Sequence, residues 1–78
     1  MSNTTLIDVF STSLNIESNL VVDTLAYSEH PNWDSTAHMI LITDLESAFD
    51  VMLEPDDIID MSSVAKARRI LAKHGVAF

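Results

Sequence analysis

The chain has 78 residues, of which 47% are hydrophobic, with one glycine and no cysteine. The lack of cysteine excludes a disulfide framework, a thiolate metal site and a cysteine nucleophile. A formal net charge of −8 disfavours binding to nucleic acid or to an anionic membrane surface, and the length predicts a single domain over residues 1–78.

The first predicted helix runs from Leu6 to Leu14, where Thr5 and Asp8 approximate a capping box. Its inner face is formed by Leu6, Val9, Phe10, Ser13 and Leu14. Residues 15–32 have no long period and predict a structured loop that packs its apolar side chains over the core. These side chains are Ile16, Leu20, Val21, Val22, Leu25 and Tyr27. A loop this long in a small domain has to be functional or anchored.

The second predicted helix runs from Ser35 to Val51, with Asp34 as its N-cap and Pro31 preventing an earlier start. Its apolar residues recur at helical spacing and predict one buried face. They are Leu41, Ile42, Leu45, Ala48, Phe49 and Met52. Trp33, just before this helix, is expected to plug the core, and its place beside Ser35 also permits contact with a bound group or a partner.

A short third helix is expected at Pro55, which suits a first-turn position, with Ile58, Ile59 and Met61 supplying its apolar contacts. A fourth helix begins at Ser62 or Ser63 and ends before Gly75, a natural residue for the end of a helix. Its predicted inner stripe is Val64, Ala67, Leu71 and His74. The fold class is therefore all-α, a small four-helix bundle with three longer helices and one short third helix.

Ser35 occupies the position that points most directly to a function. In the first turn of a helix, unpaired backbone N–H groups and the positive end of the dipole favour an attached anion. An exposed hydroxyl at that place is suited to carry a phosphodiester.

The chain resembles the acyl carrier proteins from about Leu6 to His74. The resemblance is carried by an ordered set of matches: Asp34-Ser35, Leu41, Leu45-Glu46, Phe49, Leu53, the acidic turn after it, and Ser63-Val64. Each match alone is weak, whereas their order and spacing together are fairly specific.

The resemblance implies a stand-alone carrier whose Ser35 bears a covalent 4′-phosphopantetheine arm derived from coenzyme A, with Asp34 as the adjacent motif residue. The arm holds an acyl group as a thioester, so the protein itself is not expected to be an enzyme. Its expected partners are a phosphopantetheinyl transferase and acyl-loading and acyl-using enzymes of a specialised lipid, polyketide or polysaccharide-related pathway. A monomer is expected, and the lack of a secretory signal predicts the cytoplasm.

The residues after Ser35 depart from the family pattern. Thr36 stands where carriers usually have a leucine, and Ile40 stands where those of fatty acid synthesis have an acid. An outward-facing surface is predicted to dock partner enzymes partly through apolar contact. Its residues are Thr36, Met39, Ile40, Thr43 and Glu46.

Other functions compete with the acyl carrier hypothesis. A peptidyl or aminoacyl carrier would share the same serine, and an unmodified acidic helical interaction module would need none. A hydrolase would pair Ser35 with His38, but no glycine-rich elbow surrounds them, so a packed or arm-facing histidine is expected. An acidic group around the third helix suggests weak divalent binding rather than a dedicated metal site. That group is Glu54, Asp56, Asp57 and Asp60.

Overall fold

The computed structural model describes residues 2–78, and this part of the chain is all-α, as predicted. The helices are α1 (Ser2–Leu14), α2 (Ser35–Phe49), α3 (Pro55–Asp60) and α4 (Val64–Lys73), with a single 3-10 turn, η1 (Ser18–Leu20). The predicted pattern of three longer helices, one short third helix and a long connection after the first is confirmed. None of the helices in residues 2–78 combines the length and apolar character needed to cross a membrane.

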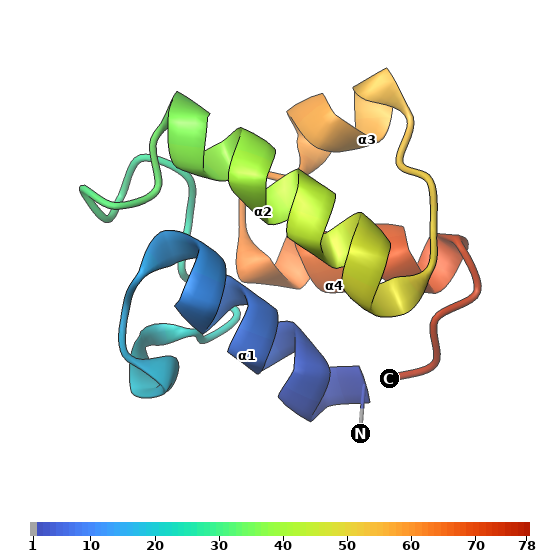
Figure 1. Ribbon diagram of the computed structural model, residues 1–78, viewed down its shortest axis with the longest axis horizontal. Helices are drawn as coiled ribbons and strands as arrows, with labels where there is room; N and C mark the ends of the chain where they lie inside the picture. The colour runs from blue at the N-terminus through green and yellow to red at the C-terminus, as the bar shows by residue number, and fades with distance from the viewer. Residues whose placement is uncertain (1) are drawn as a thin grey trace.

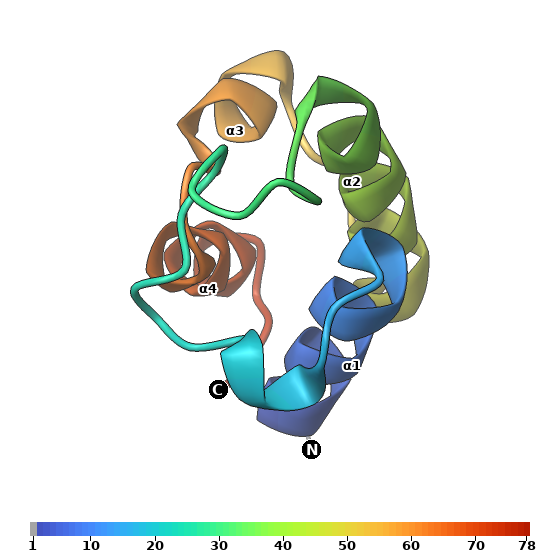
Figure 2. The ribbon, with the colours of Figure 1, turned by 90° about the vertical axis from the view of Figure 1, so that its left-hand side faces the viewer.

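The helices surround one core. Helices α1 and α2 lie side by side, α4 faces them from the other side, and α3 lies at one end near both α2 and α4 (Figures 1 and 2). The largest side chains with almost no exposed surface come from α1, α2 and α4 and from the residues just before α2 and just after α3. They are Trp33, Phe10, Leu6, Leu41, Leu45, Met61, Leu71 and Val64.

Helix α1 begins at Ser2 rather than at Leu6, so the predicted capping box at Thr5 and Asp8 is wrong. Several polar residues near the start can each cap a helix, and sequence alone does not choose among them. In the structure the Asn3 side-chain oxygen accepts a hydrogen bond from Arg68 of α4, which holds the first turn in place. The predicted inner face is otherwise correct, with Leu6, Phe10 and Leu14 buried.

Helix α2 ends at Phe49, two residues before the predicted end. Asp50 adopts the left-handed conformation (φ 54°, ψ 50°), which Asp tolerates better than most residues, and the backbone N–H of Val51 returns to the Glu46 carbonyl. Because the helix stops there, Met52 is 80% exposed. It does not join the core, so the prediction that it is buried is wrong. Ala48, also predicted to be buried, is exposed as well.

Helix α3 buries a different side from the predicted one. Ile58 is half-buried and Met61 is buried, but Ile59 is 77% exposed, because the residue that turns inward from this short helix is Asp57. In α4 the predicted residues Val64, Ala67 and Leu71 are buried, joined by Ile70, whereas His74 is only half-buried. Gly75 has φ +95°, as expected for the residue after the end of a helix.

The connection between α1 and α2 is anchored at several points. The backbone of Leu25 accepts from Val64, the N–H of Tyr27 donates to Ser62, and Ala26 and Ser63 form an isolated antiparallel bridge. Near its end, the Asn32 side chain donates to the Asn15 carbonyl at 3.0 Å. Val21 and Leu25 pack in the core as predicted, whereas Leu20, Val22 and Tyr27 are largely exposed.

Charge is distributed unevenly over this fold. All twelve acids precede α4, and all four Lys and Arg residues lie on α4. Of these four bases, two form ion pairs with acids in residues 2–78: Arg68 lies 3.0 Å from Asp23, and Lys73 lies 2.6 Å from Asp57. Most carboxylates therefore repel one another without a compensating cation.

We expect the melting temperature to rise with ionic strength or with millimolar magnesium. The Debye length is about 30 Å at 0.01 M salt and about 10 Å at 0.1 M. The longest dimension of the molecule is 30 Å, so its charges interact across the whole domain at the lower concentration. A thermal melt measured over this range checks the expectation, and an unchanged melting temperature would show that self-repulsion is negligible.

Candidate functional site

Ser35 is the first residue of α2, and its position is fixed by Asp34. Asp34 is extended (φ −107°, ψ −173°), and its Oδ1 accepts a hydrogen bond from the Ala37 N–H at 2.9 Å. The Asp34 carbonyl accepts the first helical bond, from the His38 N–H at 2.8 Å. Asp34 is therefore an N-cap, as the sequence predicted.

The Ser35 side chain is exposed, and its hydroxyl has no hydrogen-bond partner among residues 2–78. The N–H groups of Ser35 and Thr36 precede the first helical hydrogen bond, so they remain available to an anion at the N-terminus of α2. An oxygen attached here would meet both these donors and the positive end of the helix dipole. The local geometry fits a phosphodiester on Ser35.

A groove of about 310 Å³ runs from Ser35 between α2, α3 and the loop. Its lining is mostly apolar: Tyr27, Ser35, His38, Met39, Ile58, Ile59, Met61 and Ser62. Ser35, Met39 and Ile59 are exposed at its edge, whereas Met61 is buried at its base. A flexible group attached at Ser35 can thus lie along an apolar surface.

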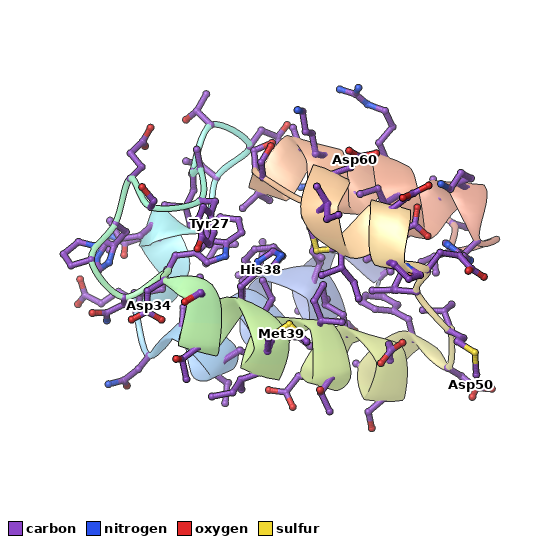
Figure 3. All side chains as sticks on the ribbon, turned by 90° about the horizontal axis from the view of Figure 1, so that it is seen from above. Tyr27, Asp34, His38, Met39, Asp50 and Asp60 are labelled. Atoms are coloured by element: carbon purple, nitrogen blue, oxygen red, sulfur yellow. The ribbon has the colours of Figure 1, made fainter. Side chains whose placement is uncertain are left out.

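His38 lines this groove and is held through both ring nitrogens. The Trp33 indole Nε1–H donates to His38 Nδ1 at 3.0 Å, so His38 Nε2 carries the proton and donates to the Ile58 carbonyl at 2.9 Å. The ring also meets Tyr27 edge-on, with centroids 5.4 Å apart, and stacks near Trp33 at 6.1 Å. Figure 3 shows Tyr27 and His38 next to each other between the loop and α2.

This arrangement bears on the hydrolase hypothesis, which pairs Ser35 with His38. A general base needs a free imidazole nitrogen directed at the nucleophile's proton. In the structure the acceptor nitrogen of His38 is taken by Trp33 and the other nitrogen by Ile58. The ring is packed, which is the role that the sequence favoured for it.

Four of the five predicted docking residues form an exposed surface on α2. Thr36 and Thr43 are exposed, and Met39 and Ile40 are 54% and 49% exposed. Glu46 differs, because it is half-buried and its Oε2 accepts from the Leu53 N–H at 2.9 Å. Glu46 therefore holds the chain that leaves α2.

The neighbouring acid of α2 is also engaged within the protein. Asp44 accepts a hydrogen bond from the Ser13 hydroxyl of α1 at 2.6 Å and is half-buried. Asp44 and Glu46 are both half-buried and hydrogen-bonded within the protein, so fewer acids of α2 are fully exposed than its sequence suggests.

In the acidic group around α3, Asp57 is buried whereas Glu54, Asp56 and Asp60 are exposed. Asp57 is 2% exposed and accepts from Lys73 Nζ at 2.6 Å and from His74 Nε2 at 2.7 Å, which holds its pKa far below the usual range. The same hydrogen bond raises the pKa of Lys73. Asp57 also accepts from the Glu54 N–H at 3.2 Å and so caps α3. Within residues 2–78, no three His, Asp or Glu side chains lie together in a way that could hold a metal ion.

Sequence reasoning did not find the α3 wall of the groove or the hydrogen bonds of His38. Trp33 and His38 are five residues apart across a helix start, a spacing with no regular period, and the Ile58 acceptor is a backbone carbonyl. The sequence held only a partial indication that Asp57 is buried: Lys73 and His74 at the end of α4 are possible partners for an acid.

Comparison with known proteins gave no similar family model, curated protein or solved structure.

Proposed function

We propose that the protein is an acyl carrier protein of the cytoplasm, which bears a 4′-phosphopantetheine arm on Ser35 and presents a thioester-bound group to partner enzymes. The observation that carries this proposal is the exposed Ser35 hydroxyl, without a hydrogen-bond partner, at the N-terminus of α2 and at the edge of an apolar groove. The ordered motif matches in the sequence support it independently.

Loading would form an ester bond between Ser35 Oγ and a phosphorus of coenzyme A. The pyrophosphate bond breaks, the nucleotide part of coenzyme A leaves, and the hydroxyl proton passes to a base of the transferase. When bound, the arm supplies a thiol that holds an acyl group as a thioester. The chain's own contribution is positional: Asp34 fixes the first turn of α2, and the N–H groups of Ser35 and Thr36 at this helix N-terminus would be available to the phosphate.

Incubation with coenzyme A and a broad-specificity phosphopantetheinyl transferase is expected to add the mass of one phosphopantetheine. Ser35→Ala should abolish this addition, whereas Ser47→Ala, an equivalent change at an exposed position of the same helix, should leave it intact. Intact-mass spectrometry measures all three proteins. Absence of the added mass from the wild-type chain with several transferases would favour the unmodified interaction module.

Partner docking is expected to depend on Ile40. Exposed charge pairs contribute little and are screened by salt, whereas an apolar side chain buried at an interface is worth about 1.5–3 kcal/mol. Because the acids nearest this surface are engaged inside the protein, Ile40→Glu should weaken binding to an acyl-using partner by at least about tenfold, which corresponds to about 1.4 kcal/mol.

The control for this variant is Thr4→Glu, which adds the same charge at an exposed position of α1. Circular dichroism should show equal helicity for both variants, and Ser35 loading should be unaffected in both. Equal partner affinity for wild type and Ile40→Glu, combined with a steep loss of affinity in salt, would assign docking to the acids instead.

A further inference from the structure

A hydrogen bond joins two walls of the groove beside Ser35. Among the lining residues, Ser35, Met39 and Ile59 are exposed. His38, also in the lining, joins α2 to α3 by donating to the Ile58 carbonyl. A group passing from the groove into the core between these helices has to break this bond.

The bond between His38 and Ile58 is held in place by its neighbours. The Ile58 carbonyl lies in the last turn of α3, where carbonyl oxygens receive no hydrogen bond from an N–H group of the same helix. His38 therefore donates to a group that would otherwise be unpaired. Trp33 donates to the other ring nitrogen and thereby fixes the tautomer that can donate to Ile58. Breaking the bond would leave partly buried polar groups unpaired, which is unfavourable.

Buried aromatic and apolar side chains lie around this bond. Trp33 has no exposed surface and meets the Phe10 ring edge-on, with centroids 5.4 Å apart. Phe10 is equally buried, and Met61 fills the base of the groove beside α3. Protein interiors packed in this way admit an added chain only by displacing side chains.

We propose that the hydrogen-bonded chain Trp33–His38–Ile58 closes the core to cargo attached through Ser35, so that this carrier transports short or polar acyl groups that stay in the groove or in solvent. The inference rests on the proposed function, since it concerns cargo held at Ser35. His38 is a positioning residue in this proposal: it sets how far the groove extends and does not react.

The expected cargo follows from the lining of the groove and from the packed side chains around the His38–Ile58 bond. A short acyl group can rest against Met39, Ile58 and Ile59 without disturbing the hydrogen bonds. A long saturated chain kept out of the core would leave apolar area in water, which is unfavourable. Polar acyl groups lose nothing by remaining exposed, so both short and polar groups suit the site.

The test compares the wild-type protein loaded from acetyl-coenzyme A with the same protein loaded from dodecanoyl-coenzyme A. A chain enclosed by the folded protein would raise the melting temperature by roughly 4–8 °C or more, because it would stabilise only the folded state. We expect the two forms to melt within about 2 °C of each other. The indole N–H signal of Trp33, the one tryptophan of the chain, should be at the same position in both NMR spectra.

His38→Ala removes the closing hydrogen bond and opens space beside Trp33. In this variant the dodecanoyl form should melt at a higher temperature than the acetyl form, and its indole signal should move. Met39→Ala is the matched control, because it widens the edge of the groove without touching the hydrogen bonds, and it should behave like the wild type. Trp33→Phe, which keeps an aromatic ring but removes the donor, provides a second variant if His38→Ala does not fold.

Two results would overturn the inference while leaving Ser35 loading intact. One is a wild-type protein that is stabilised by the dodecanoyl chain and whose indole signal moves on loading. The other is indifference to chain length in both His38→Ala and Trp33→Phe. Failure of the wild type to accept any acyl group on Ser35 would instead contradict the proposed function, and this inference with it.

Discussion

Trp33→Ala is expected to lower the free energy of unfolding by about 3–5 kcal/mol, the range for truncating a buried large aromatic residue. Trp33 has no exposed surface, meets Phe10 and Tyr27 edge-on, and donates its indole hydrogen to His38. The substitution therefore opens a cavity and also leaves an imidazole nitrogen without its donor. Because a native domain is stable by only about 5–15 kcal/mol, this loss should remove a large part of the stability of the fold.

Urea or thermal unfolding followed by circular dichroism measures the effect. Met52→Ala serves as the control, because the apolar period of the sequence assigns Met52 to the core whereas the structure exposes 80% of it. A surface substitution of this kind should change stability by no more than about 0.5 kcal/mol. A larger loss for Met52→Ala than for Trp33→Ala would mean that the end of α2 is wrongly described.

Asp57→Asn is expected to lower the melting temperature by more than about 4 °C. The carboxylate of Asp57 is buried and accepts from Lys73, from His74 and from the Glu54 N–H. An amide of the same shape has a single oxygen and carries N–H groups of its own, so at least one of the three donors loses its acceptor and meets another donor instead. Asp56→Asn, the same change at the adjacent exposed position, should shift the melting temperature by less than about 2 °C.

The contribution of Asp57 should also depend on pH. Its hydrogen bonds to Lys73 and His74 hold its pKa well below the ordinary value of about 4, so the folded state favours the ionised form. Stability from this group is complete above about pH 5 and is lost as the pH falls through the unfolded-state pKa toward the lower folded-state value. The difference in melting temperature between wild type and Asp57→Asn should therefore shrink from pH 6 toward pH 2. A constant difference over this interval would show that the ion pair does not stabilise the fold.

Much of the fold follows from local signals in the sequence. Asp34 and Ser63 are short polar residues before apolar-periodic runs, and both accept an N-capping hydrogen bond in the structure. Pro55 opens α3, and Gly75 follows the end of α4 with a positive φ. These signals act within a few residues, so they determine where helices begin and end without reference to the rest of the chain.

Other features depend on contacts between distant segments and could not be predicted. The first turn of α1 is held by Arg68, sixty-five residues away from Asn3. Asp50 ends α2 in the left-handed conformation. An aspartate tolerates this conformation but is equally common on the surface of a continuing helix, so the residue type alone does not predict the end. Burial of Asp57 in place of Ile59 follows from the position of Lys73 and His74, which the sequence pattern of α3 alone does not reveal.

The candidate site also combines features that local sequence predicts with features that depend on distant segments. The position of Ser35 after an N-cap was predicted, because it depends on local sequence alone. The groove was not, because its walls come from the loop, α2 and α3 together. The predicted docking surface also included Glu46. The structure exposes Thr36, Met39, Ile40 and Thr43, whereas Glu46 is half-buried and its carboxylate accepts from the backbone of Leu53.

Residue-level localisation of the group transferred from coenzyme A tests the central claim most directly. The chain has nine serines, and several are engaged in the structure: Ser11 donates to Ile16, Ser13 to Asp44, and Ser63 caps α4. After treatment with a phosphopantetheinyl transferase, tandem mass spectrometry of proteolytic peptides should place one phosphopantetheine on Ser35 and none on the other eight serines. Modification of a different serine, or an unmodified Ser35 peptide under conditions that load a known carrier protein, would contradict the account.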